Sequence, residues 1–183
     1  MLVSDDLQGS VEAALVILVP EVEPLVSAFR LKHDPFAGMG IPAHITIDYP
    51  FLPGIDPGQQ LHRELAELFV KTDAFQFAFR DLARFPDVLY LAPDPVTPFK
   101  QLIDMVAARF PESPPYGGAF DNVVPHLTIA QTEDEEMLKS IERQVARLLP
   151  EYLPLSTRAE NVWLMDNRTG IWQKRNSFPL RRK

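Results

Sequence analysis

Apolar residues along this 183-residue chain recur with two periods, one typical of strands and one typical of helices. Short aliphatic runs and alternating aromatic residues predict strands, which we expect over residues 13–19, 43–49, 75–79, 88–91 and 126–131. Apolar residues at helical spacing predict helices, which we expect over residues 20–32, 57–70, 97–110 and 132–149. The last helix is expected to begin with a capping box from Thr132 to Glu135, and segments 155–165 and 170–178 are expected to close as a hairpin.

The predicted elements repeat once along the chain. Each half contains a strand, a helix, a glycine-bearing loop, a proline, a histidine-containing strand, a helix and a further strand. The approximate halves are residues 11–84 and 85–180. A repeat of this length is too long for a solenoid and favours duplication into two pseudo-symmetric lobes. We therefore predict an α+β fold in a single domain, residues 1–183. Its two lobes of antiparallel or mixed sheet, with outer helices, should surround a central cleft.

Two matching histidine segments carry the candidate chemistry. One reads His44-Ile-Thr46-Ile and the other reads His126-Leu-Thr128-Ile. Because residues two apart in a strand point to the same face, each histidine should share a face with its threonine. Neutral imidazole can accept a proton and imidazolium can donate one near neutral pH, while hydroxyl groups can donate hydrogen bonds to phosphate oxygens. The segments therefore predict an acid–base pair that acts on a phosphodiester.

Other chemistries fit these residues less well. A histidine followed by threonine also occurs in ordinary strands, because threonine favours strands, but two such segments with matching flanks are rarer by chance. A metal site could combine a histidine with Asp48 and Asp121, yet no His-x-x-x-His motif or carboxylate-rich loop accompanies them. The chain also lacks a Gly-x-Ser-x-Gly elbow, a Walker loop and a dinucleotide fingerprint. We therefore expect neither a metal nor a cofactor.

The composition excludes several classes of protein. The chain has no cysteine, which rules out disulfides, thiolate zinc sites and cysteine nucleophiles. Its net charge of −7 argues weakly against non-specific binding to long nucleic acid. The acidic residues 1–6 do not resemble the basic start of a signal peptide, and the apolar run 11–19 is too short to cross a bilayer. We expect a cytoplasmic protein with no membrane partner.

The paired segments resemble the motifs of the two-histidine phosphoesterase superfamily, and within it the bacterial 2′-5′ RNA ligase-like proteins. The segment 117–126 and the closing stretch 172–180 extend the resemblance over essentially the whole chain. The resemblance implies two pseudo-symmetric α+β lobes and metal-independent action on 2′,3′-cyclic phosphates or 2′-5′ linkages of nucleotides and RNA ends. It also implies that His44 and His126 are the catalytic acid and base, in an order left open, and that the phosphate is bound by Thr46 and Thr128.

Departures from the relatives narrow the expected substrate. Gln131 stands where many relatives carry a basic residue, and Asp48-Tyr-Pro replaces a more apolar stretch. Proteins that bind long RNA contact its backbone phosphates with Arg or Lys. Both changes therefore favour a mononucleotide, a dinucleotide or another small cyclic phosphate as substrate over long RNA. Two alternatives stay open, a non-catalytic binder of phosphorylated nucleotides or RNA ends and a 2′-5′ RNA ligase, and we expect a monomer. Aromatic residues in loop-like segments near the motifs are candidates for base stacking, namely Phe36, Phe85, Tyr116 and Phe120.

Overall fold

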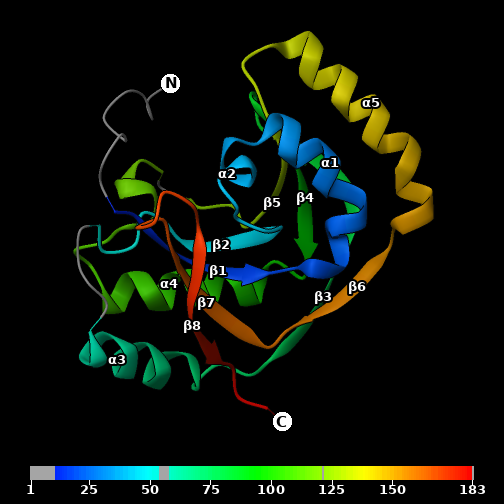
Figure 1. The fold of residues 1–183 in the computed structure, drawn as a ribbon. Coiled ribbons are helices and arrows are strands. Elements are labelled where there is room, and N and C mark those ends of the chain that lie inside the picture. Colours follow the sequence, from blue (N-terminus) through cyan, green and yellow to red (C-terminus); the bar gives the residue numbers. More distant parts are fainter. Residues whose placement is uncertain (1–10, 54–57, 121, 183) are drawn as a thin grey trace.

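The computed structural model of the protein describes residues 11–53, 58–120 and 122–182, which form two four-stranded antiparallel sheets (Figure 1). The first sheet has the strand order β2 (His44–Asp48), β1 (Ala13–Leu18), β7 (Asn161–Asp166) and β8 (Gln173–Pro179). The second has the order β5 (Leu127–Gln131), β4 (Val88–Asp94), β3 (Phe75–Arg84) and β6 (Leu155–Ala159). Each histidine segment therefore forms or leads into an edge strand, and the two edge strands β2 and β5 contact each other.

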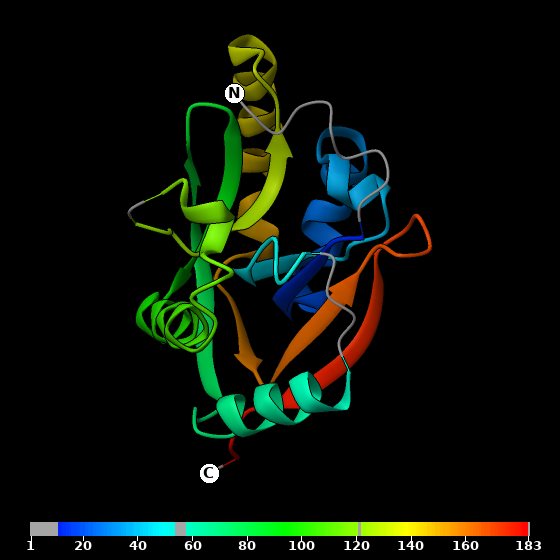
Figure 2. The ribbon, with the colours of Figure 1, turned by 90° about the vertical axis from the view of Figure 1, so that its left-hand side faces the viewer.

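One helix of each half packs against the histidine strand of the other half. The α-helices of the described residues are α1 (Glu23–His33), α2 (Pro35–Gly38), α3 (Gln59–Phe69), α4 (Thr97–Arg109) and α5 (Glu135–Tyr152), with short 3₁₀ turns η1 (Pro20–Val22) and η2 (Pro115–Gly118). Helix α1 follows β1 of the first sheet yet packs against β5, beside α5, whereas α4 follows β4 of the second sheet yet packs against β2. Figures 1 and 2 show α3 at the end of the molecule opposite to α5.

The interior is built by the residues that alternate with the histidines and threonines. Ile45 and Ile47 on β2, and Leu127 and Ile129 on β5, are at most 1% exposed. They belong to one continuous apolar core that runs through both sheets and includes residues of α1, α3, α4 and α5. Burying a side chain of this size contributes about 1.5–3 kcal/mol. Because this face is committed to the core, the opposite face of both strands is left for polar side chains.

The two sheets do not follow the predicted division of the chain at residue 84. Strand β3 belongs to the first half but pairs with β4 and β6 in the second sheet, while β7 and β8 return to the first sheet. The predicted segment 155–165 is therefore two strands, because the chain crosses from one sheet to the other at Glu160. The predicted hairpin is confirmed for its second part, β7 with β8.

Most predicted helices and strands are confirmed with different ends, but the start of α5 differs. Its N-cap is Asp134, whose side chain accepts a hydrogen bond from the Met137 N–H at 3.0 Å. The Thr132 hydroxyl instead accepts from the Asp134 N–H at 3.2 Å, so the predicted capping box from Thr132 to Glu135 is wrong. The short helix α2 was not predicted, since four residues show no periodicity. No helix of the described residues is long and apolar enough to cross a membrane.

Candidate active site

His44 is the first residue of β2 and His126 immediately precedes β5, the two edge strands that contact each other, and both rings are held in the same way. Nδ1 of His44 lies 2.7 Å from the carbonyl oxygen of Pro42, and Nδ1 of His126 lies 2.7 Å from that of Val124. A carbonyl oxygen only accepts hydrogen bonds, so Nδ1 of each ring carries a proton and donates it. Nε2 of each neutral ring is then the atom that can exchange a proton with a bound molecule.

A β-bulge follows the threonine in both histidine strands. The extra residue is Ile47 on β2 and Ile129 on β5, at the same place in the two motifs. Bulges bend a strand and change the direction of nearby side chains, and they are frequent next to active sites. Thr46 and Thr128 immediately precede the bulges and are half-buried, as are the two histidines. The pseudo-symmetry of the two motifs therefore extends to an irregularity of the backbone.

The two imidazoles influence each other's charge. Burial lowers the pKa of His44 to about 4, and the positive charges of Arg30 and His126 act in the same direction. Burial also lowers the pKa of His126. Both rings are therefore neutral at neutral pH in the free protein, and a proton on one opposes a proton on the other. Such a pair can hold a single proton, which is what one acid and one base require.

A buried ion pair lies beside His44. Nη2 of Arg30 is 2.9 Å from Oδ2 of Asp34, and both side chains are almost fully buried. The guanidinium also donates to the Ile41 carbonyl at 3.3 Å, and Oδ1 of Asp34 accepts from the Phe36 N–H at 3.0 Å. These contacts hold the loop that leads into β2. Our sequence prediction missed this pair, although the i,i+4 spacing of the two charges was a signal for it.

Two aromatic rings pack against His126. The centroids of the Phe85 and Tyr90 rings lie 5.2 Å and 5.3 Å from that of the imidazole, and the two rings contact each other at 4.5 Å. Tyr90 is buried and Phe85 is half-buried. Of the candidate stacking residues, Phe85 is thus adjacent to a motif histidine. The neighbouring Tyr90 was missed because it lies inside an apolar strand.

Tyr116 connects the loop before β5 to Thr46 on β2. Its N–H donates to the Tyr49 carbonyl at 2.6 Å, and its hydroxyl is hydrogen bonded with Thr46. Its φ of +52° is rare for a residue with a side chain, which indicates strain held by the surrounding contacts. Burial raises the pKa of the Tyr116 phenol, so it stays protonated and can donate a hydrogen bond.

The other two candidate stacking residues contact aromatic rings outside the two histidine motifs. Phe36 packs edge-on against Tyr49 and Trp172, with ring centroids 5.7 Å and 6.4 Å away, in a small apolar cluster that includes Ile41. Phe120 is 61% exposed and contacts the Tyr116 ring at 5.6 Å. Base stacking stays a prediction for all four residues.

Asp48 is fully buried without a well-oriented partner. Neither carboxyl oxygen has a hydrogen bond of good geometry, and burial raises the pKa of Asp48 to about 7, with a smaller opposing effect of the Tyr49 N–H. In the part of the chain that the structure describes, no cluster of three or more His, Asp or Glu side chains could hold a metal ion. Asp121, the second carboxylate considered for a metal, lies outside the described residues.

A comparison with protein families and a comparison with solved structures agree with each other. The family model of the 2′-5′ RNA ligase superfamily matches residues 18–170. The crystal structure of E. coli LigT complexed with NADP+ has a TM-score of 0.58 and 17% identity over 94% of this chain and 98% of that one. LigT complexed with 3′-AMP has a TM-score of 0.58 and 16% identity over 94% of this chain and 99% of that one. TT0787 of Thermus thermophilus has a TM-score of 0.57 and 18% identity over 94% of this chain and 99% of that one. At such identities these likenesses show a shared fold. A comparison with curated proteins gives no significant match.

Proposed function

Because the chain belongs to the 2′-5′ RNA ligase superfamily, we propose that it is a metal-independent phosphodiesterase with His44 and His126 as its acid–base pair. The observation that carries the proposal is that the two imidazole rings make the same hydrogen bond. Each donates from Nδ1 to a backbone carbonyl at 2.7 Å, which leaves Nε2 of each ring for proton transfer. Each ring also lies beside a half-buried threonine hydroxyl that can bind a phosphate oxygen.

The pKa of His44 supports its role as the base and leaves the role of the acid to His126. A pKa of about 4 keeps the His44 ring neutral over a wide pH range. In the reaction a water oxygen attacks phosphorus while Nε2 of His44 takes one water proton. The bond between phosphorus and the leaving oxygen breaks, and Nε2 of protonated His126 gives its proton to that oxygen. The negative charge of the bound phosphodiester favours the protonated form of His126 in the complex.

The proposed substrate is a nucleotide or RNA end that carries a 2′,3′-cyclic phosphate or a 2′-5′ linkage. E. coli LigT, which shares the fold, has been crystallised with 3′-AMP and with ATP, and this supports a nucleotide as ligand. The net charge of −7 favours a small nucleotide over long RNA, since like charges repel along an extended contact.

The test is a panel of 2′,3′-cyclic nucleotides and 2′-5′ dinucleotides, with the product position determined by phosphorus NMR. His44→Ala and His126→Ala should each lower kcat at least about 100-fold, the usual minimum contribution of a general acid or base. His62→Ala, at an exposed position of α3, is the matched control and should keep full activity. EDTA should leave the rate unchanged.

Two outcomes would overturn the proposal. Turnover that persists in both single histidine variants would show that His44 and His126 are not the acid–base pair. Tight binding of the same nucleotides without any product would favour the non-catalytic binder. Thermal melting of each variant separates a loss of catalysis from a loss of folding.

A further inference from the structure

A hollow opens on the first sheet next to His44. Its volume is about 170 Å³, below the roughly 300–1,000 Å³ of pockets that enclose a whole drug-sized ligand. The hollow can therefore take one ring system rather than an entire dinucleotide. Its walls come from β1, the turn η1, the loop before β2 and the β7–β8 pair, and consist of Leu18, Pro20, Pro42, Trp163 and Lys174.

Two walls of the hollow are directly connected to His44. Leu18 is paired with His44 across the sheet, and the carbonyl of Pro42 accepts the hydrogen bond from its Nδ1. Trp163 on β7 lies on the same face, because its partner on β1 is in turn the partner of Thr46. A group bound in the hollow would thus lie on the face of the first sheet that carries the side chains of His44 and Thr46.

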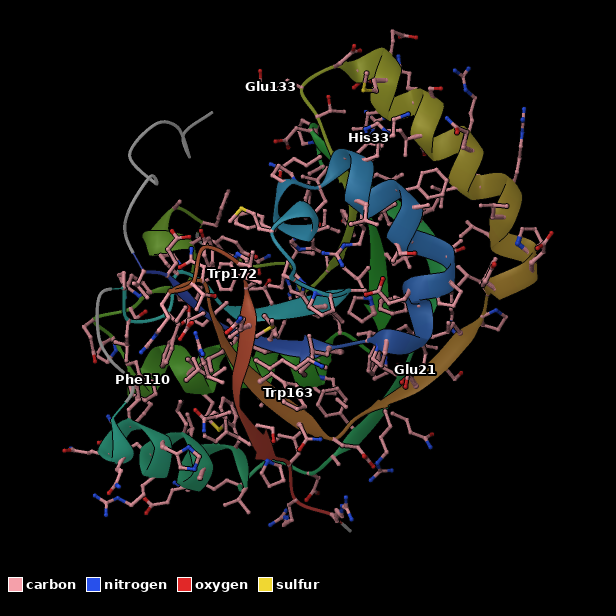
Figure 3. All side chains as sticks on the ribbon, viewed as in Figure 1. Glu21, His33, Phe110, Glu133, Trp163 and Trp172 are labelled. Carbon is pink, nitrogen blue, oxygen red and sulfur yellow. The ribbon has the colours of Figure 1, made fainter. Side chains whose placement is uncertain are left out.

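Trp163 and Lys174 give the hollow an aromatic wall and a positive charge. Trp163 is partly exposed, and Nζ of Lys174 lies 5.0 Å from the centre of its ring. Figure 3 labels Trp163 apart from Trp172, which is buried in the apolar cluster beneath α2. No carboxylate of the described residues forms an ion pair with Lys174. The indole ring and this ammonium group, which lies over the ring and has no carboxylate partner among the described residues, match a nucleobase that carries a phosphate.

The surroundings of His126 are different. There the Phe85 and Tyr90 rings pack directly on the imidazole, with centroids 5.2 Å and 5.3 Å away. These two rings therefore contact the imidazole itself, whereas Trp163 contributes to the wall of a hollow. The two halves, although similar in backbone, differ in the aromatic side chains near their histidines.

We propose that this hollow is a nucleobase subsite, in which one base of the substrate stacks on Trp163 and Lys174 binds a phosphate oxygen of the same nucleotide. The proposal rests on the proposed function, since it places one nucleoside of the phosphodiester on the His44 side. One ring-sized hollow anchors mononucleotides and dinucleotides equally. Every base has a π-face, so the site discriminates weakly among bases.

Binding is tested by isothermal titration calorimetry of adenosine 3′-monophosphate and of adenosine. Trp163→Ala should weaken the binding of both ligands about 5- to 160-fold, the equivalent of the roughly 1–3 kcal/mol that stacking of one base contributes. Trp163→Phe, which keeps an aromatic face, should retain most of the affinity. Lys174→Met should weaken the phosphate-bearing ligand alone. Lys71→Met, at an exposed position after α3, is the matched control and should change neither affinity.

The subsite and the catalytic proposal fail independently. In turnover, Trp163→Ala should raise KM for a 2′,3′-cyclic nucleotide while kcat stays within about threefold, because the proton-transfer groups are untouched. Unchanged binding of both ligands by folded Trp163→Ala would overturn the subsite, even when the two histidine variants are inactive. Binding that is lost in Trp163→Ala, in a protein without turnover, would uphold the subsite and overturn the catalytic proposal alone.

Discussion

Asp48 on β2 occupies the position that Ala130 occupies on β5, since each is the second residue after the threonine of its motif and follows the bulge. Each pairs with a buried leucine, Leu15 for Asp48 and Leu89 for Ala130. Both positions are 0% exposed. A methyl group fills this apolar position in the second half, whereas in the first half a carboxyl group stands there without a well-oriented hydrogen bond.

Asp48→Ala should stabilise the protein, and the gain should grow as the pH rises. Burial raises the pKa of Asp48 from 3.8 to about 7, so between these values the folded protein holds a proton that the unfolded chain has lost. The free energy of unfolding therefore falls as the pH rises through this window and stays lower above it. The expected gain above the window is about 1–3 kcal/mol, the cost of an unsatisfied buried polar group.

Urea unfolding below and above the window measures this gain. Asp48→Asn keeps the shape of the side chain and removes its charge, so it should show the same pH dependence as Asp48→Ala. A gain that is equal at both ends of the window would contradict the ionisation of Asp48 as its cause.

The value of kcat/KM should be highest on the acid side of pH 6.5 and should decrease above it. Burial lowers the pKa of His126 from 6.5 and that of His44 to about 4, so the free protein carries one proton on the pair only in this acid range. The bound phosphate anion favours imidazolium, so the descending limb of kcat should lie at higher pH than that of kcat/KM. Steady-state kinetics over the pH range check both limbs, and an optimum of kcat/KM on the alkaline side would contradict the lowered pKa values.

Tyr116→Phe should lower kcat about fivefold, the equivalent of about 1 kcal/mol for one hydrogen bond, because Thr46 loses the partner that orients its hydroxyl. Thr46→Val should cost more, and the double variant should lose less than the two single losses combined. Tyr152→Phe on α5 is the control and should keep the wild-type rate. Additive losses would show that Tyr116 does not act through Thr46.

Arg30→Met should destabilise the protein by about 3–5 kcal/mol, because it leaves the Asp34 carboxylate buried without its partner. Combining it with Asp34→Asn should restore most of this loss, since the neutral amide oxygen can still accept from the Phe36 N–H. Removing the guanidinium should also raise the pKa of His44, which proton NMR titration of its imidazole measures. An unchanged pKa would show that burial alone sets it.

The sequence predicted the two faces of the histidine strands, because their alternation reflects local geometry. Ile45 and Leu127 enter the core and the histidines do not, as a period of two requires. The same period places Asp48 on the histidine face, but the bulge at Ile47 pairs it with Leu15 instead. A bulge depends on how two strands pair, so it has no signal in a single strand.

The partners of the sheets could not be predicted for a similar reason. Strand β3 reads as the end of the first half, yet it joins the second sheet through contacts with β4 and β6. Trp163 was not a candidate because its strand reads as half of a hairpin, and its place near His44 depends on the pairing of β7 with β1. Contacts between distant segments decided both, and hydrophobic periodicity does not report them.

Helices α1 and α4 each support the histidine strand of the other half of the chain, α1 against β5 and α4 against β2. Each histidine strand therefore pairs with a strand of its own half but receives a packing helix from the other half. A chain cut in the turn between β3 and β4 would give two fragments that each carry one histidine of the proposed acid–base pair, and activity should return only when the fragments are mixed. We therefore expect the site to assemble only as the whole chain folds. A substitution that disrupts folding far from either imidazole should then abolish activity as well.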